Sequence, residues 1–175
     1  MSLSLRIRKL ESIDAHALDG LIEVLVDCVE GGASVNFMLP ITRTKAAAYW
    51  AAVAQGLTRG DRVLIVAEDD AGIVGTAQAV WAGPENQPHR ADISKMLVHR
   101  RARRQGVGAA VLAAAERAAF EAGRTLLVLD TASADAERLY ERGGWQRVGT
   151  IPKYALMPDG PFCATVVYYK DLTPG

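Results

Sequence analysis

Apolar and charged positions alternate at the start of the chain and then change to a helical spacing. Residues 3–10 alternate apolar with polar side chains, which predicts a strand with one buried face. Apolar residues next recur every three or four positions until Gly31, after a candidate N-cap at Ser12 or Asp14. This spacing predicts a helix that stops at Gly31, and a second helix is predicted from Thr42 to about Leu57.

The middle of the chain contains a strong hairpin pattern. Residues 62–67 and 73–81 predict two strands, joined by a turn over Asp69–Gly72. Residues 91–99 predict a further strand. It leads through an arginine-rich stretch into a helix from about Gly106 to Ala122.

The last third continues this alternation of strands and helices. Residues 124–131 form an unbroken apolar run, typical of a strand buried on both faces. A short helix is predicted over 134–142, and strands over 145–152 and 164–172 flank a Pro-Asp-Gly turn. The predicted order β-α-α-β-β-β-α-β-α-β-β indicates a single α/β domain with a mixed sheet over residues 1–175.

Composition narrows the class of protein. Half of the residues are hydrophobic, and 20 basic residues balance 20 acidic ones. A dedicated nucleic-acid-binding protein usually has a basic surplus, so any basic cluster here is local. Two cysteines give no disulfide framework, and no signal peptide or membrane-spanning run is evident. We therefore expect a soluble, cytoplasmic protein that binds neither nucleic acid nor membrane.

The basic cluster lies directly before a glycine-rich turn. Four arginines occupy positions 100–104, and Gly106 and Gly108 follow at the predicted start of a helix. The free amides of a first helical turn bind anions, and glycine leaves room for a phosphate. A solvated loop and a tight strand-to-helix turn are the structural alternatives. The stretch lacks the Lys-Ser/Thr of the Walker loop and the third glycine of the dinucleotide fingerprint.

Two stretches carry a family resemblance. MLVHRRARRQGVGAAVL resembles motif A of the GNAT N-acetyltransferase superfamily through Arg103, Gly106 and Gly108. ADAERLYERGGW resembles motif B, with the following residues at the usual spacing: Ala136, Leu139, Tyr140, Gly144 and Trp145. GGASVNFM, LVLDT and RVGTIPKYALMPDG further resemble the tabtoxin-resistance type within that superfamily. The resemblance implies a GNAT fold: a mostly antiparallel, twisted sheet of about seven strands, flanked by four helices, with splayed central strands.

The resemblance also implies acetyl-CoA as the acetyl donor. Main-chain amides from Arg104 to Ala109 would bind the pyrophosphate, and the main chain of Met96 and Val98 would pair with the pantetheine arm. Arg100 and Arg101 would lie near the phosphates or remain solvated. The full set implied for acetyl-CoA is Met96, Leu97, Val98, Arg103, Arg104, Gln105, Gly106, Val107, Gly108 and Ala109.

Acetyl transfer requires an acid for the leaving sulfur and a route for the proton of the amine. The resemblance implies Tyr140 as the general acid, with a buried aromatic anchor as the structural alternative. For the base it implies Asp130 or Asp92. A structural role, such as capping the next helix, is the alternative for either carboxylate. A chain of water molecules could also remove the proton.

The acceptor pocket is expected from Asn36, Phe37, Met38 and Tyr154, although Phe37 and Met38 would suit a core equally well. The three histidines lack ligand-like spacing, so no metal is expected. The implied function is acetylation of a primary amine on a small molecule, such as a toxin or antibiotic of amino-acid type. The alternatives are an acetyl-CoA sensor, an acetyltransferase of peptides or polyamines, and a nucleic-acid-binding module. A homodimer is expected from the family resemblance alone.

Overall fold

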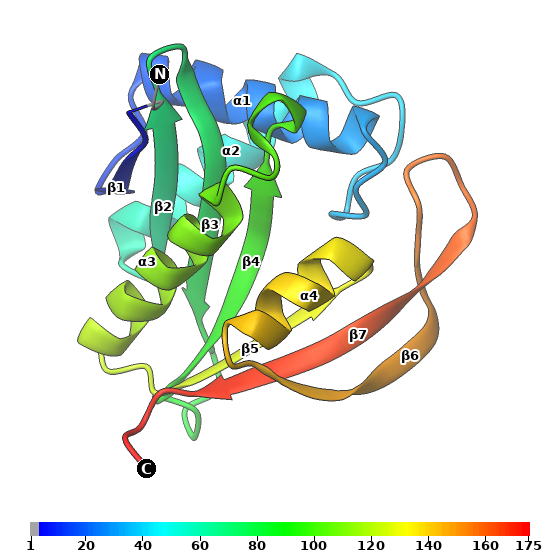
Figure 1. Cartoon of the computed structure of the whole chain (residues 1–175). Helices are drawn as coiled ribbons and strands as arrows, with labels where there is room; N and C mark the ends of the chain where they lie inside the picture. The colour runs from blue at the N-terminus through cyan, green and yellow to red at the C-terminus, as the bar shows by residue number, and fades with distance from the viewer. Residues whose placement is uncertain (1–3) are drawn as a thin grey trace.

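One mixed sheet runs through the described part of the chain, residues 4–175 of a computed structural model (Figure 1). Its seven strands lie in the order β1-β2-β3-β4-β5-β7-β6. Only β4 and β5 pair in parallel, and the other neighbours are antiparallel. The strands are β1 (Arg6–Leu10), β2 (Arg62–Asp69), β3 (Gly72–Trp81), β4 (Arg90–Val98), β5 (Leu126–Thr131), β6 (Gln146–Leu156) and β7 (Phe162–Asp171).

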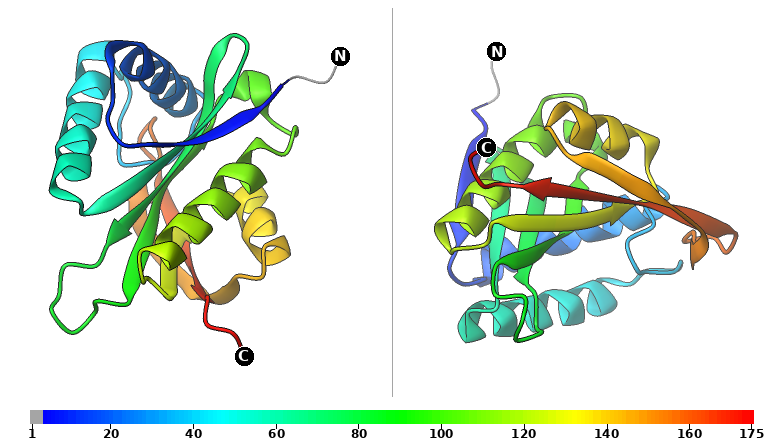
Figure 2. Two further views of the ribbon diagram at one scale, coloured as in Figure 1. Left: turned by 90° about the vertical axis from the view of Figure 1, so that its left-hand side faces the viewer. Right: turned by 90° about the horizontal axis from the view of Figure 1, so that it is seen from below.

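Four α-helices in residues 4–175 cover the two faces of this sheet (Figure 2). They are α1 (Ala15–Glu30), α2 (Arg43–Arg59), α3 (Val107–Glu121) and α4 (Ala134–Arg142). The first two helices pack on one face, around Leu25, Trp50 and Leu64, and the last two pack on the other, around Val111 and Leu127. This arrangement confirms the expected fold class. No helix within residues 4–175 has the length and apolar character needed to cross a membrane.

Local chemistry sets the ends of the first two helices. The Asp14 carboxylate accepts a hydrogen bond from the Ala17 amide at 2.8 Å, so Asp14 caps α1. Thr42 caps α2 in the same way. Gly60 ends α2 in a left-handed conformation, with φ of 72°, which glycine adopts without steric cost. Helix α2 therefore ends at Arg59, within two residues of the predicted end near Leu57.

The first strand differs from its prediction. Strand β1 begins at Arg6 and only Leu10 is buried, because β1 is an edge strand whose remaining side chains face solvent. Leu3, which was predicted to belong to the buried face, lies outside the described residues. The alternating pattern therefore predicted the strand correctly but the burial of its face wrongly.

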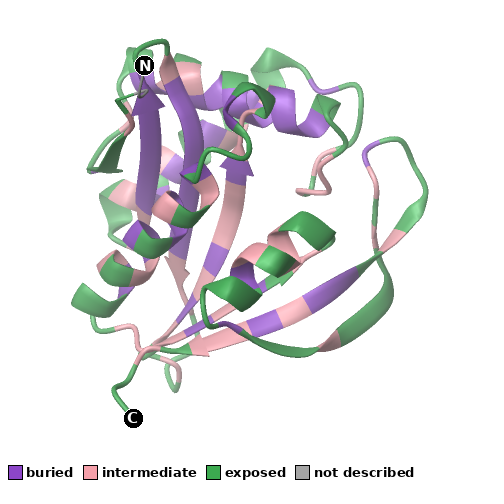
Figure 3. Ribbon diagram, viewed as in Figure 1, coloured by how far each residue is buried: buried purple, intermediate pink, exposed green. Residues whose placement is uncertain are grey.

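The last three strands also differ from prediction. Only Leu127 and Leu129 of β5 are buried, because helices cover just one face of the sheet at this point. Strand β6 continues past Pro152 to Leu156 and is exposed along nearly its whole length (Figure 3). Proline is tolerated there because β6 is an edge strand whose register shifts between Ile151 and Ala155.

The centre of the sheet opens between β4 and β5. These strands pair only over Arg90–Asp92 and Leu126–Val128, and beyond this point each pairs solely with its other neighbour. Their ends therefore diverge, as the implied splay requires. Main-chain groups of β4 that face the gap have no strand beside them.

Candidate functional site

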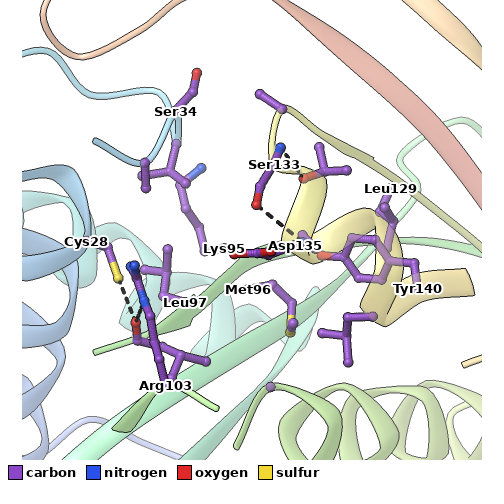
Figure 4. A pocket seen from close by; sticks show the side chains of 18 of the residues that line it. Cys28, Ser34, Lys95, Met96, Leu97, Arg103, Leu129, Ser133, Asp135 and Tyr140 are labelled. Carbon is purple, nitrogen blue, oxygen red and sulfur yellow. Dashed lines mark hydrogen bonds between the residues drawn. The ribbon is translucent and has the colours of Figure 1, made fainter. Parts of the chain in front are cut away.

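A pocket of about 890 Å³ lies where β4 and β5 separate. Figure 4 shows its side chains converging from β4, the loop before α3, the end of α1 and helix α4. The loop after α1 closes one side through Ser34 and Asn36. The pocket thus touches elements from both faces of the sheet.

Strand β4 supplies a free main-chain edge to this pocket. The His99 amide donates to the Val74 carbonyl of β3 at 2.8 Å. Successive residues of a strand direct their main-chain groups to opposite sides, so Val98 and Met96 direct theirs toward the gap. The Val98 carbonyl accepts long hydrogen bonds from the Cys28 thiol and from Arg103 Nε, both at 3.4 Å, whereas no strand pairs with the rest of this edge. This edge can pair with an extended ligand as another strand would.

The start of α3 forms the second part of the site. Gly106 precedes the helix in a left-handed conformation, and no side chain caps the amides that follow it. The first main-chain bond into the helix runs from the Ala110 amide to the Gly106 carbonyl. The amides of Val107, Gly108 and Ala109 therefore remain available to an anion.

Gly108 also keeps the groove open. A Cβ atom on Gly108 would lie 3.3 Å from Leu139 Cδ2 of α4 and 3.7 Å from Val98 Cγ2 of β4. Any larger side chain at this position would extend into the space between α4 and β4. Glycine at position 108 therefore provides the close approach that a phosphate-bearing ligand needs.

The arginine cluster divides into two pairs. Arg100 donates to Asp27 at 2.9 Å, and Arg101 forms two hydrogen bonds with the buried Asp69. These two arginines attach the loop to α1 and to the end of β2, and neither lines the pocket. Arg103 and Arg104 do line it.

Two other residues predicted to hold acetyl-CoA, Gln105 and Leu97, relate to the pocket in different ways. Gln105 is not among the lining residues, and its side-chain amide donates to the Arg101 carbonyl at 3.3 Å. Leu97 is buried in the core beneath α1 and α2. Its side chain therefore stabilises the fold, and Leu97 also lines the pocket.

This division predicts opposite effects for two arginine substitutions. Arg101→Met should lower the free energy of unfolding by about 1–3 kcal/mol at pH 7, because a buried carboxylate loses charge-assisted bonds. The Arg101 hydrogen bonds hold the Asp69 pKa below its usual value. Their contribution is therefore present at neutral pH and lost as the pH falls through the lowered pKa, so the difference should shrink in acid. Urea unfolding at several pH values measures it.

Arg103→Met is the matched comparison. It should weaken acetyl-CoA binding about five- to tenfold through the lost charge and leave unfolding unchanged. Isothermal titration of both variants with acetyl-CoA tests the division. If Arg101→Met bound acetyl-CoA more weakly than Arg103→Met, this division of the arginines would be wrong.

Tyr140 of α4 brings a phenol into the same pocket. Its ring is buried between Trp145 and Tyr168, with ring centroids 5.8 and 5.9 Å away. Burial raises the pKa of Tyr140 well above its usual value, and the negative charge of Asp130 acts in the same direction. The hydroxyl has no hydrogen-bond partner among residues 4–175. It therefore carries its proton at neutral pH and is free to donate it to a ligand.

The two candidate bases lie in different places. Asp130, at the end of β5, lines the pocket and accepts a hydrogen bond from the Thr165 hydroxyl at 2.6 Å. It is exposed, contrary to the burial predicted from its apolar strand. Asp92 lies where β4 and β5 are still paired, outside the pocket, and binds Arg90 at 2.8 Å. The structure therefore brings Asp130, and not Asp92, together with Tyr140.

The four residues predicted to bind the acceptor also lie in different parts of the structure. Asn36 lines the pocket, whereas Phe37 packs edge-to-face on Tyr49 with centroids 5.5 Å apart. Met38 lies in a shallow hollow beside Pro158, outside the main pocket. Tyr154 is 55% exposed on β6 and lines neither hollow. Of these four residues only Asn36 lies in the main pocket, because the loop turns toward α2 after Asn36 and Phe37 takes the packing role given as its alternative.

Other residues of the pocket were not predicted from the sequence. They include Lys95 on β4, Ser133 before α4, Arg138 on α4 and Cys28 on α1. Burial raises the pKa of the Cys28 thiol to about 11, so it is uncharged at neutral pH. For Lys95, the available signal was a charged residue inside the mostly apolar stretch ISKMLV. Within residues 4–175 no three His, Cys, Asp or Glu side chains lie together as metal ligands.

Known proteins show the same architecture. Residues 60–147, half of the chain, match the family model described as the acetyltransferase (GNAT) domain. A ribosomal-protein-alanine N-acetyltransferase from Brucella melitensis is 22% identical, with a TM-score of 0.79, over 95% of this chain and 99% of its own.

Two similar structures were solved with acetyl-CoA. One is a phosphinothricin acetyltransferase from Sinorhizobium meliloti, which is 19% identical with a TM-score of 0.78, over 98% of this chain and 89% of its own. The other, yncA from Salmonella typhimurium, is 18% identical with a TM-score of 0.79, over 98% of this chain and 96% of its own. At these identities the likeness shows the fold.

Proposed function

The chain belongs to the GNAT family of N-acetyltransferases, and on that basis we propose that it moves the acetyl group of acetyl-CoA to the primary amine of a small molecule. The observation that carries this proposal is the continuity of the pocket. It runs from the uncapped first turn of α3, along the free edge of β4, to the hydroxyl of Tyr140. A donor with phosphates at one end and a thioester at the other matches that sequence of groups.

The residues that would hold the donor follow from this geometry. The amides of Val107, Gly108 and Ala109 bind its diphosphate, and Arg103 and Arg104 add positive charge beside them. Met96 and Val98 bind the pantetheine arm through their main chains. The donor supplies an acetyl group activated as a thioester.

Transfer then requires one bond to form and one to break. The amine nitrogen attacks the thioester carbonyl carbon, the new C–N bond forms, and the C–S bond breaks. Tyr140 donates its proton to the leaving sulfur, and Asp130 receives the proton that the amine loses, directly or through water. Tyr140 suits this role because it keeps its proton at neutral pH and has no other partner among the described residues.

Asp130 and Asp92 offer a matched test of the base. Asp130→Asn should lower kcat/KM for the amine about 10- to 100-fold, because the carboxylate that binds the amine and takes its proton is lost. Asp92→Asn should stay within about twofold of wild type, since Asp92 lies outside the pocket. Steady-state kinetics on both variants decide the assignment, and equal losses would refute it.

The acceptor is proposed as a small amine, and the resemblance to the tabtoxin-resistance type favours one of amino-acid type. A thiol-release assay with acetyl-CoA and a panel of amines, including amino acids, polyamines and short peptides, tests the activity. We expect coenzyme A release with small amines. Binding of acetyl-CoA without release would instead indicate a sensor, and release only with peptides would indicate a peptide acetyltransferase.

A further inference from the structure

Lys95 occupies an irregular position in β4. Thr76 of β3 pairs with Leu97, and Gln78 pairs with Ser94, so that Lys95 and Met96 together face Ala77. Lys95 has a φ of 50°, a left-handed conformation that is rare for a residue with a side chain. Such bulges redirect side chains and often occur beside active sites.

Because of the bulge, the side chains of Lys95 and Met96 point to different faces of the sheet. Met96 packs against the core beneath α3 and α4. Lys95 instead lies over the ring of Tyr49 on α2, with Nζ 5.7 Å from the ring centroid. Figure 4 shows Lys95 in the pocket, between the loop of Ser34 and the helix of Tyr140 in this view. The ammonium is therefore on the α2 side of the gap.

Tyr49 is itself held in place. Its hydroxyl accepts a hydrogen bond from the Gln78 side-chain amide at 2.9 Å, and its ring packs against Phe37 and Trp50. The surface on which Lys95 rests is therefore rigid. A pre-positioned ammonium loses little conformational freedom when it binds a ligand.

The charge of Lys95 has no direct partner. No carboxylate oxygen among residues 4–175 lies within 4.0 Å of its Nζ. Burial lowers the pKa of Lys95, and the more distant negative charge of Asp130 opposes this effect. A half-buried ammonium has lost hydration, and an anionic ligand would compensate for that loss.

Asp130 faces the same side of the sheet as Lys95. Its neighbour Leu129 packs into the core beneath α3 and α4, so the alternation of β5 directs Asp130 to the opposite face. The α2 side of the pocket thus presents one cation and one anion that do not pair with each other. A molecule bearing an ammonium and a carboxylate on neighbouring atoms could satisfy both.

We propose that Lys95 determines acceptor specificity by binding a carboxylate of the amine substrate while Asp130 binds its amine. The inference rests on the proposed function and names its substrate class: amines that carry a carboxylate near the reacting nitrogen, as amino acids do. The phosphates of the donor are proposed to bind at the start of α3 and its arginines, which line the same pocket. Lys95 is thus left for the acceptor.

Matched pairs of amines test this role. The twenty amino acids are compared with their decarboxylated amines and their carboxamides, with saturating acetyl-CoA. Wild type should favour the carboxylate member of each pair that it acetylates. Lys95→Met should raise KM for that member by about tenfold or more and leave KM for the decarboxylated member within about twofold. Lys95→Arg should restore much of the preference.

Each other outcome overturns the proposal in an identifiable way. A fall in kcat with every amine, at unchanged KM, would make Lys95 a proton-transfer group. If wild type acetylated an amino acid and its decarboxylated amine equally well, amines that carry a carboxylate would be excluded as the preferred substrate class. The same would follow if wild type bound acetyl-CoA but acetylated none of the amines. Failure to bind acetyl-CoA would instead refute the proposed function itself. Lys45→Met, on the exposed face of α2, controls for loss of a positive charge.

Discussion

Gly108→Glu should abolish acetyl-CoA binding while the protein remains folded. The added side chain would enter the groove between Leu139 and Val98, where the diphosphate is proposed to bind. Steric exclusion and like-charge repulsion together should weaken binding about 100-fold or more. Isothermal titration with acetyl-CoA measures this loss, and the thiol-release assay should fall in parallel.

The Gly108→Glu protein should lose acetyl-CoA binding without losing stability. Glutamate is a better helix former than glycine and is favoured in the first turn of a helix, so these gains offset the contact with Leu139. The free energy of unfolding should stay within about 1 kcal/mol of wild type. Ala113→Glu, on the exposed side of α3, adds the same charge to the same helix and should leave binding intact. Unaltered affinity in Gly108→Glu would show that the phosphates bind elsewhere.

Tyr140→Phe should slow turnover about 100-fold, because the leaving sulfur loses its proton donor. The ring and its packing against Trp145 and Tyr168 are retained. The hydroxyl has no partner among residues 4–175, so its removal leaves no buried group unpaired. Affinity for acetyl-CoA and the free energy of unfolding should therefore remain close to wild type. Single-turnover kinetics at saturating acetyl-CoA isolate the chemical step.

Tyr168→Phe provides the matched control for Tyr140→Phe. The Tyr168 hydroxyl lies 3.1 Å from a Glu137 carboxylate oxygen and 3.0 Å from a Glu141 carboxylate oxygen, so its one proton is shared between them, and the residue is fully buried. Its loss should cost about 1–3 kcal/mol of stability, with little change in turnover. If Tyr140→Phe instead turned over at the wild-type rate, the acid would have to be another group.

Much of the fold was predictable because local signals and topology agree. Asp14, Thr42 and Gly31 mark helix ends by capping chemistry that depends only on near neighbours. The anion site expected at the arginine-glycine stretch before α3 was likewise predictable, since a strand-to-helix turn with two glycines leaves main-chain amides free. Burial was less predictable. It depends on which face the helices cover, and they leave one face of β5 and nearly all of β6 open.

The site was predictable in part for a related reason. Tyr140 and Gly108 follow from motifs whose spacing fixes their place on α4 and α3. The sequence could not show that Lys95 points into the pocket. Strict alternation along β4 assigns each side chain to one face, and the bulge at Lys95 changes that assignment. The separate roles of Arg101 and Arg103 depend on Asp69, which is distant in sequence and meets Arg101 only in the folded protein.

A crystal structure of the wild-type protein with acetyl-CoA would show directly whether the donor binds along β4 and the start of α3. We expect diphosphate oxygens within hydrogen-bonding distance of the Val107–Ala109 amides, the pantetheine arm paired along β4, and the thioester sulfur beside the Tyr140 hydroxyl. A thioester bound away from Tyr140, or a diphosphate that leaves those amides free, would contradict this expectation.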